Sequence, residues 1–213
     1  HEIKNPLTPI QLSAERIRSK YLSELDPKQR ETLDRSTRTI VQQVEAMKAM
    51  VNAFSEYARP APLHRVSTDL NQLINDTVEL FRSGQSQIEL RTEPDTRLER
   101  IQIDPNSFRQ VLNNLVINAQ DALAGGEGAV TIRTEEDSKT GIVTVTVQDN
   151  GPGFDPQSID RVFEPYVSAK DKGTGLGLAI CRRIIEEHGG SIRASNPQQG
   201  GAAVIISLPL RRQ

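Results

Sequence analysis

The sequence of 213 residues contains no tryptophan and a single cysteine, Cys181. One cysteine excludes an internal disulfide framework and a zinc site built on cysteine pairs, and it is compatible with a reducing cytoplasm. No apolar run approaches the ~20 residues that a membrane-spanning helix needs. We therefore expect this stretch of chain to be cytoplasmic.

A strong excess of charge of either sign is also missing. Lysine and arginine together number 26 and the acidic residues 28, so the net charge is −2. A balanced surface gives no general attraction to nucleic acid or to an anionic membrane, and any phosphate binding must be local. The sequence begins at His1-Glu2-Ile3 without a methionine. We expect a fragment of a longer protein, with any membrane anchor in upstream segments.

The first sixty residues carry apolar residues at alternating spacings of four and three, which is typical of a helix that packs along another helix. A turn-like segment, residues 23–27, separates two such seams. Their members are Ile3, Leu7, Ile10, Ala14, Ile17 and Tyr21, then Leu33, Thr37, Ile40, Val44, Met47, Val51, Phe54 and Ala58. The pattern predicts an antiparallel helical hairpin over residues 1–59. Because two narrow seams bury little alone, we expect a homodimer that forms a four-helix bundle.

Prolines at positions 60 and 62 predict a stiff linker over residues 60–68, and a second domain follows over 69–213. Expected helices are 69–81, 104–123 and 176–188, and expected strands are 88–92, 100–103, 130–134, 142–148, 191–194 and 203–208. The predicted fold is an α+β two-layer sandwich, a mixed sheet with helices on one face.

Two glycine clusters lie in this second domain, Asp149-Asn150-Gly151-Pro152-Gly153-Phe154 and Gly173-Thr174-Gly175-Leu176-Gly177-Leu178. They bracket a segment that is too irregular for a strand, and we predict a lid over residues 152–174. The second cluster runs into an apolar helix, so its N–H groups would bind an anion such as phosphate. Lys170 is a candidate cation for the same phosphates, although a lysine in a loop is often only solvated.

Five motifs in order resemble the boxes of bacterial sensor histidine kinases of two-component systems. His1-Glu2-Ile3-Lys4-Asn5-Pro6-Leu7 is similar to the phosphoacceptor box, and Asn114 to Ala119 to the asparagine box. The two glycine clusters resemble the glycine boxes, with Phe163-Glu164-Pro165-Tyr166 between them as the phenylalanine motif. That motif and Asn118-Ala119-Gln120-Asp121-Ala122 look like the nitrogen-regulation branch of the family.

The resemblance implies a role for each residue of the phosphoacceptor box. His1 would be the nucleophile that attacks the γ-phosphoryl group of ATP, because it lies off the apolar seam and should face solvent. Glu2 resembles the acid/base residue that accepts the proton. Asn5 lies one turn beyond His1 on the same face, where its amide would orient water against a phosphorylated partner aspartate.

The asparagine box predicts a magnesium site. Asn114 and Asn118 are four residues apart, so both amides project from one helix face. An amide oxygen suits Mg²⁺, which keeps waters and nucleotide phosphates in its shell. The resemblance makes Asn118 the metal ligand and Asn114 its support. Without the glycine boxes, an equally good interpretation would be that both side-chain amides only form hydrogen bonds to nearby backbone groups.

The glycine boxes predict the two ends of an ATP site. Asp149 ends a strand of valines, and the resemblance implies that its carboxylate accepts a hydrogen bond from the adenine amino group. Gly151 and Gly153 leave room for the base. Gly173, Thr174, Gly175, Leu176 and Gly177 would contact the phosphates through the backbone. A simple Asp-Asn-Gly turn is the alternative at Asp149.

The sequence thus predicts ATP-dependent autophosphorylation of His1 and phosphotransfer to an aspartate of a response-regulator receiver domain, with phosphatase activity toward that regulator. One alternative is an ATPase of the gyrase and chaperone superfamily. Those enzymes resemble this chain but carry a glutamate where Asn114 stands, and an amide cannot take a proton from water. The other alternative is a dimeric scaffold that binds nucleotide without transferring phosphate.

Overall fold

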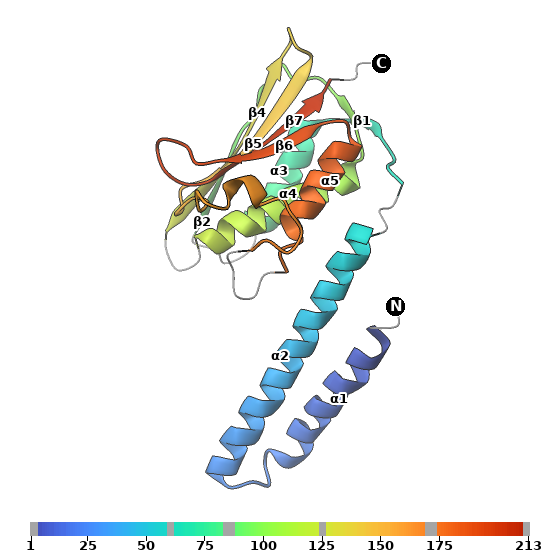
Figure 1. Cartoon of the computed structure of the whole chain (residues 1–213), viewed down its shortest axis with the longest axis vertical. Coiled ribbons are helices and arrows are strands. Elements are labelled where there is room, and N and C mark those ends of the chain that lie inside the picture. Colours follow the sequence, from blue (N-terminus) through green and yellow to red (C-terminus); the bar gives the residue numbers. More distant parts are fainter. Residues whose placement is uncertain (1–3, 59–61, 83–87, 124–126, 169–173, 211–213) are drawn as a thin grey trace. The chain divides into compact units, whose positions relative to one another are not determined.

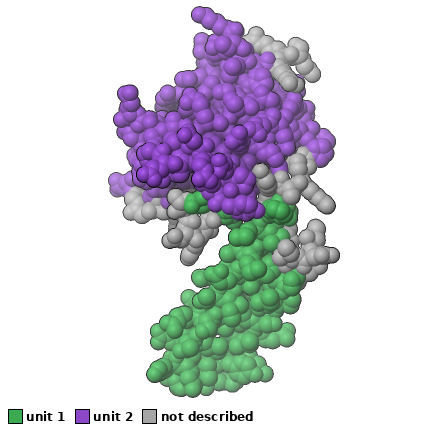
Figure 2. Space-filling view, in the orientation of Figure 1, with its two compact units in different colours: residues 1–60, 168–174 green, residues 61–167, 175–213 purple. Residues whose placement is uncertain are grey.

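The structure is a computed structural model that describes residues 4–58, 62–82, 88–123, 127–168 and 174–210. The chain divides into two compact units, residues 1–60 with 168–174 and residues 61–167 with 175–213 (Figure 2). His1, Glu2, Lys170 and Gly173 of the expected site lie outside the described residues.

The first unit contains the predicted helical hairpin, α1 (Lys4–Tyr21) and α2 (Pro27–Ala58) (Figure 1). Asp26 begins α2, because its Oδ1 accepts hydrogen bonds from the N–H groups of the second and third residues that follow it, each at 3.0 Å. Arg18 Nε lies 2.6 Å from Asp34 Oδ1, and Lys48 Nζ donates to Gln11 Oε1 at 2.7 Å. These pairings run in opposite directions along the two helices, so the hairpin is antiparallel.

Only some members of the two apolar seams are buried inside the hairpin. Leu7, Ala14, Thr37 and Val44 are 3–5% exposed. Six other members are 43–51% exposed, Ile10, Ile17, Tyr21, Ile40, Met47 and Phe54, and Leu33 and Val51 are half-buried. We call these six residues the exposed stripe. The hairpin alone therefore leaves half of its apolar seam in contact with solvent.

The second unit contains the predicted mixed sheet, which has five strands in the order β2-β4-β5-β7-β6, whereas the sixth expected strand, residues 100–103, lies in a separate sheet of two strands. The strands are β2 (Ile88–Glu93), β4 (Gly128–Asp137), β5 (Ile142–Asp149), β7 (Ala203–Pro209) and β6 (Ser191–Ser195). β2 pairs parallel with β4, and the other neighbours pair antiparallel. The strands match the predicted positions and extend beyond them by a few residues.

Three helices cover one face of this sheet: α3 (Leu70–Arg82), α4 (Pro105–Ala122) and α5 (Gly177–Glu187) (Figure 1). Along β5 the valines at 143, 145 and 147 are buried, whereas Thr144 and Thr146 on the other face are half-buried. This alternation has the period of two residues that a sheet with one covered face requires. The predicted fold class is confirmed.

A further strand, β1 (Val66–Thr68), lies within the range expected as linker and pairs antiparallel with β3 (Ile101–Ile103). Asp104 holds this connection, because its Oδ2 accepts from His64 N at 2.8 Å while its Oδ1 caps α4. Burial raises the pKa of Asp104, but these N–H donors outweigh it and the net pKa lies below the usual value.

His188 is bonded to the backbone of Asp104, the residue that holds the segment around His64. It is 3% exposed, its Nε2 accepts from Asp104 N at 3.0 Å, and its Nδ1 bonds to Ile184 O at 2.7 Å. Both ring nitrogens are therefore satisfied by the backbone. His188 is therefore a structural residue.

Candidate active site

Asp149 is the last residue of β5 and is 7% exposed. Its Oδ1 accepts hydrogen bonds from Gly151 N at 2.8 Å and Ala202 N at 3.3 Å. Its Oδ2 has no hydrogen-bond partner among the residues that the structure describes. One oxygen thus fixes the carboxylate on the sheet, and the other remains able to accept a hydrogen bond from a ligand.

The turn after Asp149 needs its glycines. A Cβ on Gly151 would lie 2.9 Å from Asp149 Oδ1, and Gly153 has a φ of +83°, which side chains rarely adopt. Asn150 fixes the turn from outside, because its Oδ1 accepts from Ala129 N at 2.8 Å. The local sequence therefore forms a rigid turn that holds the carboxylate at the end of a buried strand.

The asparagine box lies on α4, opposite the beginning of α5. Asn114 Nδ2 donates to Gly177 O at 3.4 Å, so the amide of Asn114 links the two helices. Asn118 is half-buried one turn further along α4. The structure therefore places Asn114 of the asparagine box next to Gly177 of the second glycine box.

Cys181 lies behind this contact on α5. Its Sγ is 3.9 Å from Val111 O, and complete burial raises the pKa of its thiol to about 12. A thiol with this pKa stays protonated and is a poor nucleophile. Cys181 is therefore a packing residue between α4 and α5.

The second glycine box bends sharply before α5. Gly175 has a φ of +64° and its carbonyl accepts from Tyr166 N at 2.9 Å. Thr174 is half-buried, Leu176 is fully buried, and α5 begins at Gly177. The first N–H groups of α5 have no partner within the helix, which favours an anion at this end.

The phenylalanine motif anchors the described part of the lid. Phe163 is 7% exposed and Val162 is 8% exposed, next to a short 3₁₀ helix, η1 (Ile159–Arg161). The ring of Tyr166, the last residue of the same motif, does not anchor the lid, because Tyr166 is 63% exposed. Its backbone is fixed instead, with a φ of +66° and the bond to Gly175.

Some predicted site residues have no described geometry. His1, Glu2, Lys170 and Gly173 lie outside the described residues, and Asn5 belongs to α1 without a described side chain. Sequence reasoning also missed Asn196 and Gly201 in the loop between β6 and β7, which contact the Asp149 turn. The Gly200-Gly201 pair is the sequence signal from which this loop could have been found.

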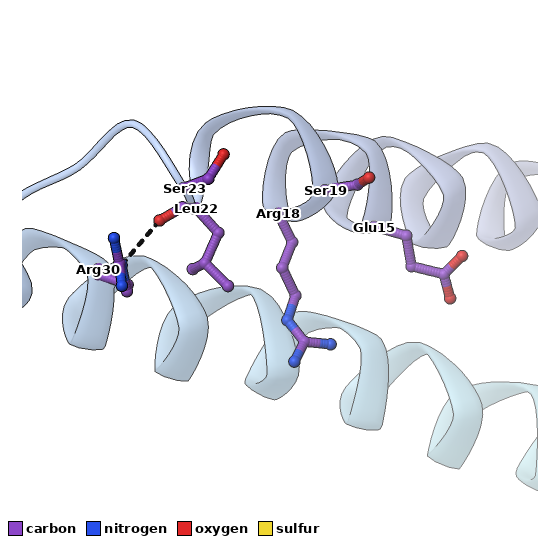
Figure 3. A pocket seen from close by; sticks show the side chains of 6 residues that line it. All are labelled: Glu15, Arg18, Ser19, Leu22, Ser23 and Arg30. Carbon is purple, nitrogen blue, oxygen red and sulfur yellow. Dashed lines mark hydrogen bonds between the residues drawn. The ribbon is translucent and has the colours of Figure 1, made fainter.

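In the described part of the chain, no group of three or more histidine, cysteine, aspartate or glutamate residues is arranged to hold a metal ion. A hollow of about 530 Å³ does occur near the tip of the hairpin. Figure 3 shows its lining from both helices and their connection, with Arg30 Nε donating to Leu22 O at 2.9 Å. The lining residues of this hollow all belong to the hairpin, and Asp149 and Gly175 to Gly177 belong to the other unit.

None of the helices within the described ranges combines the length and the apolar character that crossing a membrane requires.

Comparison with family models gives two matches in order along the chain. Residues 1–62 match the His Kinase A (phospho-acceptor) domain. Residues 103–212 match the Histidine kinase-, DNA gyrase B-, and HSP90-like ATPase family.

Curated relatives match the chain over nearly its whole length. Nitrogen regulation protein NtrY of Azorhizobium caulinodans is 39% identical, over 98% of this chain and 27% of NtrY. Sensor histidine kinase ZraS of Salmonella typhi is 36% identical, over 99% of this chain and 44% of ZraS. The chain thus spans less than half the length of these relatives.

Solved structures match both units. The catalytic domain of histidine kinase ThkA, in a nucleotide-free form, is 35% identical with a TM-score of 0.62, over 69% of this chain and 96% of that one. ThkA in complex with the response regulator protein TrrA is 32% identical with a TM-score of 0.73, over 100% of this chain and 60% of that one.

Proposed function

This chain belongs to the sensor histidine kinases of bacterial two-component systems, and from this membership we propose that it transfers the γ-phosphoryl group of ATP to His1. The observation that carries the proposal is the order of the two matched domains, a phosphoacceptor hairpin followed by a nucleotide-binding sandwich. The hairpin supplies an acceptor, and the sandwich supplies the geometry for a nucleotide.

The adenine end of the site would be the Asp149 turn. Oδ1 of Asp149 is fixed by two N–H donors, so Oδ2 is held in one position before any ligand arrives. An ionised acceptor on rigid scaffolding suits the exocyclic amine of adenine, because a preorganised group loses little entropy on binding. Gly151 and Gly153 have no side chain between the turn and a bound base.

The phosphate end would be the backbone of Thr174 to Gly177 with the first turn of α5, joined outside the described residues by Gly173 and Lys170. Asn118 fits a magnesium ion, because it is half-buried on α4 one turn beyond Asn114, whose amide touches Gly177. An amide oxygen is a suitable Mg²⁺ ligand, and the bound ion would neutralise charge on the phosphates.

Transfer to a side chain is favoured over hydrolysis by the residue at position 114. A carboxylate there would take a proton from water, whereas Asn114 presents an amide that donates to Gly177 O. The proposed ATPase alternative therefore lacks its general base at this position.

In the proposed reaction a neutral imidazole nitrogen of His1 attacks the γ-phosphorus. The N–P bond forms as the bond from phosphorus to the β,γ-bridging oxygen breaks, and ADP leaves with that oxygen. Glu2 would accept the proton from the second imidazole nitrogen. A receiver aspartate then takes the phosphoryl group from His1 and forms an acyl phosphate.

We propose that the partner of this second step is a response-regulator receiver domain, and the solved complex of the similar ThkA with the response regulator protein TrrA supports this proposal. Asn5 would orient a water molecule for the phosphatase reaction, in which phosphate is removed from the regulator. The exposed stripe supports a homodimer, because a second hairpin would bury its six apolar residues.

The test is incubation with ATP labelled on the γ-phosphate, with Mg²⁺ present. We expect an acid-labile and alkali-stable label on the chain, which EDTA and the substitution His1→Gln both abolish. His64→Gln is the matched control, since His64 contributes its backbone N–H to the fold and should keep the label. The same assay on a chain with further residues before His1 tests the reaction inside a continuous helix.

Label on serine or threonine, or label that survives His1→Gln, would contradict the proposal. Release of inorganic phosphate without any label on the chain would favour the ATPase alternative. Nucleotide binding with neither label nor phosphate release, in both chain lengths, would favour the scaffold alternative.

A further inference from the structure

The loop between β6 and β7, residues 196–202, lies directly against the turn that follows β5. Asp149 N donates to Ala202 O at 2.9 Å, and Ala202 N returns a bond to Asp149 Oδ1 at 3.3 Å. Further along the turn, Asn196 meets Phe154. Two segments that are 42 to 53 residues apart in the sequence thus form one structural unit at the proposed adenine end.

Asn196 binds both polar groups of a single backbone residue. Phe154 N donates to Asn196 Oδ1 at 2.8 Å, and Asn196 Nδ2 donates to Phe154 O at 2.8 Å. A carboxamide has a donor and an acceptor at the spacing of a backbone strand, so it replaces a strand partner where none is available. The pair fixes the orientation of Phe154, the residue at which the chain leaves the turn for the lid.

The two segments approach so closely that side chains would not fit between them. A Cβ on Gly153 would lie 3.0 Å from Asn196 Oδ1 and 3.0 Å from Gly201 O. A Cβ on Gly201, whose φ is +83°, would lie 1.9 Å from Asp149 O. The backbone of the loop therefore packs directly on the backbone of the turn, and the Asn196 amide is in close contact with Gly153.

Asn196 is exposed, whereas the carboxylate that it helps to place is buried. Water competes with exposed hydrogen bonds, so their removal costs global stability little. The position of residues 150–154 depends more strongly on the two hydrogen bonds of Asn196. Among the described residues, the other hydrogen bonds that hold this turn are made at Asp149 and Asn150. Loss of the Asn196 pair should thus loosen the turn without unfolding the sheet.

We propose that Asn196 is a positioning residue for nucleotide binding, which holds the first glycine turn in the conformation that receives the base. The inference rests on the proposed function, since it concerns the adenine end of that same site. Asn196 lies in the loop before β7, outside the asparagine and glycine boxes that were identified from the sequence.

The experiment measures the Kd for ADP by calorimetry, with the melting temperature of the nucleotide-free chain measured alongside. For Asn196→Ala we expect Kd to rise about three- to tenfold, the size of one lost hydrogen bond, with little change in melting temperature. Asn196→Asp keeps the acceptor for Phe154 N but sets a second oxygen against Phe154 O. Its affinity defect should shrink as the pH falls and the introduced carboxyl gains a proton to donate.

Asn71→Ala is the matched control. Asn71 also makes two side-chain hydrogen bonds, donating to Asp95 O at 2.9 Å and accepting from Thr134 Oγ1 at 2.8 Å. Thr134 pairs with Val145, four residues before Asp149 along β5, so this pair lies away from the proposed site. We expect Asn71→Ala to lower the melting temperature and to leave the Kd for ADP unchanged.

An unchanged Kd in Asn196→Ala, when the original chain binds ADP, would overturn this inference and leave the proposed function intact. Equal losses of affinity in Asn196→Ala and Asn71→Ala would also overturn it, since the effect would then follow stability. If the original chain itself does not bind ADP, the proposed function fails, and the role of Asn196 fails with it.

Discussion

At the scale of single residues, the chemistry of Asp149 lies in the difference between its two oxygens. Oδ1 accepts two N–H groups and belongs to the fold, whereas Oδ2 has no partner within the described ranges. A carboxylate divided in this way can be altered at one oxygen with little effect on the other. The division therefore allows binding and folding to be tested separately.

Asp149→Asn should weaken nucleotide binding while the fold persists. The introduced amide keeps an acceptor for Gly151 N but turns an NH₂ group toward the adenine amine, so two donors face each other. Loss of a charge-assisted bond costs roughly 1.5–3 kcal/mol, and we expect the Kd for ADP to rise about ten- to a hundredfold. Calorimetric titration measures this change.

Asp137→Asn is the matched control, because Asp137 lies at the far end of the hairpin formed by β4 and β5 and caps its turn by accepting from Lys139 N at 2.9 Å. It should bind ADP as the original chain does. Equal affinity of Asp149→Asn and Asp137→Asn would rule out Asp149 as the adenine-binding residue.

At the scale of elements, the two glycines of the second box differ in what surrounds them. A Cβ on Gly175 would lie 2.6 Å from the backbone of Tyr166, and the φ of Gly175 is +64°. A Cβ on Gly177 would meet nothing within 4 Å. The bend before α5 therefore requires glycine at position 175, and the fold alone does not require it at position 177.

We expect Gly175→Ala to destabilise the nucleotide-free chain and Gly177→Ala to leave it equally stable or slightly more so. Alanine at a left-handed φ costs about 1–2 kcal/mol before the contact with Tyr166 is added. Alanine at the first residue of α5 favours the helix by up to about 1 kcal/mol over glycine. Urea denaturation followed by circular dichroism measures both. Equal destabilisation by the two variants would contradict the conformation of this bend.

At the scale of the whole molecule, the hairpin by itself leaves many of its apolar side chains exposed to solvent. Six apolar side chains of the exposed stripe are 43–51% exposed, although other members of the same seams are almost fully buried. Burying one such side chain fully is worth about 1.5–3 kcal/mol. A second copy of the hairpin is the occupant that matches this stripe, because the same residues would meet across a twofold axis.

Ile17→Glu should therefore weaken dimerisation, because it places a charge within the stripe. We expect the dimer dissociation constant from sedimentation equilibrium to rise at least about tenfold, which corresponds to ~1.4 kcal/mol. Leu12→Glu is the control: Leu12 is 58% exposed but lies off the seam, so it should leave the dimer unchanged. A monomeric original chain at high concentration, or equal effects of both variants, would count against the dimer.

The sequence by itself determined most of the elements and the identity of the boxes. Helix periodicity and the glycine turns depend on residues within one or two turns of each other, so a local pattern is enough to predict them. Local motifs of the same kind, and their resemblance to the boxes of the family, led us to predict that Asp149, Asn114 and the two glycine clusters belong to one ATP site.

Only the tertiary structure decided which residues support that site. Asn196 reaches Phe154 across 42 residues, Ala202 reaches Asp149 across 53, and Asp104 binds His64 across 40. No local pattern encodes such contacts, because they exist only once the sheet has brought the segments together. The exposure of Tyr166 and of half of each helical seam has the same origin: periodicity tells which residues share a face, and packing decides whether that face is covered.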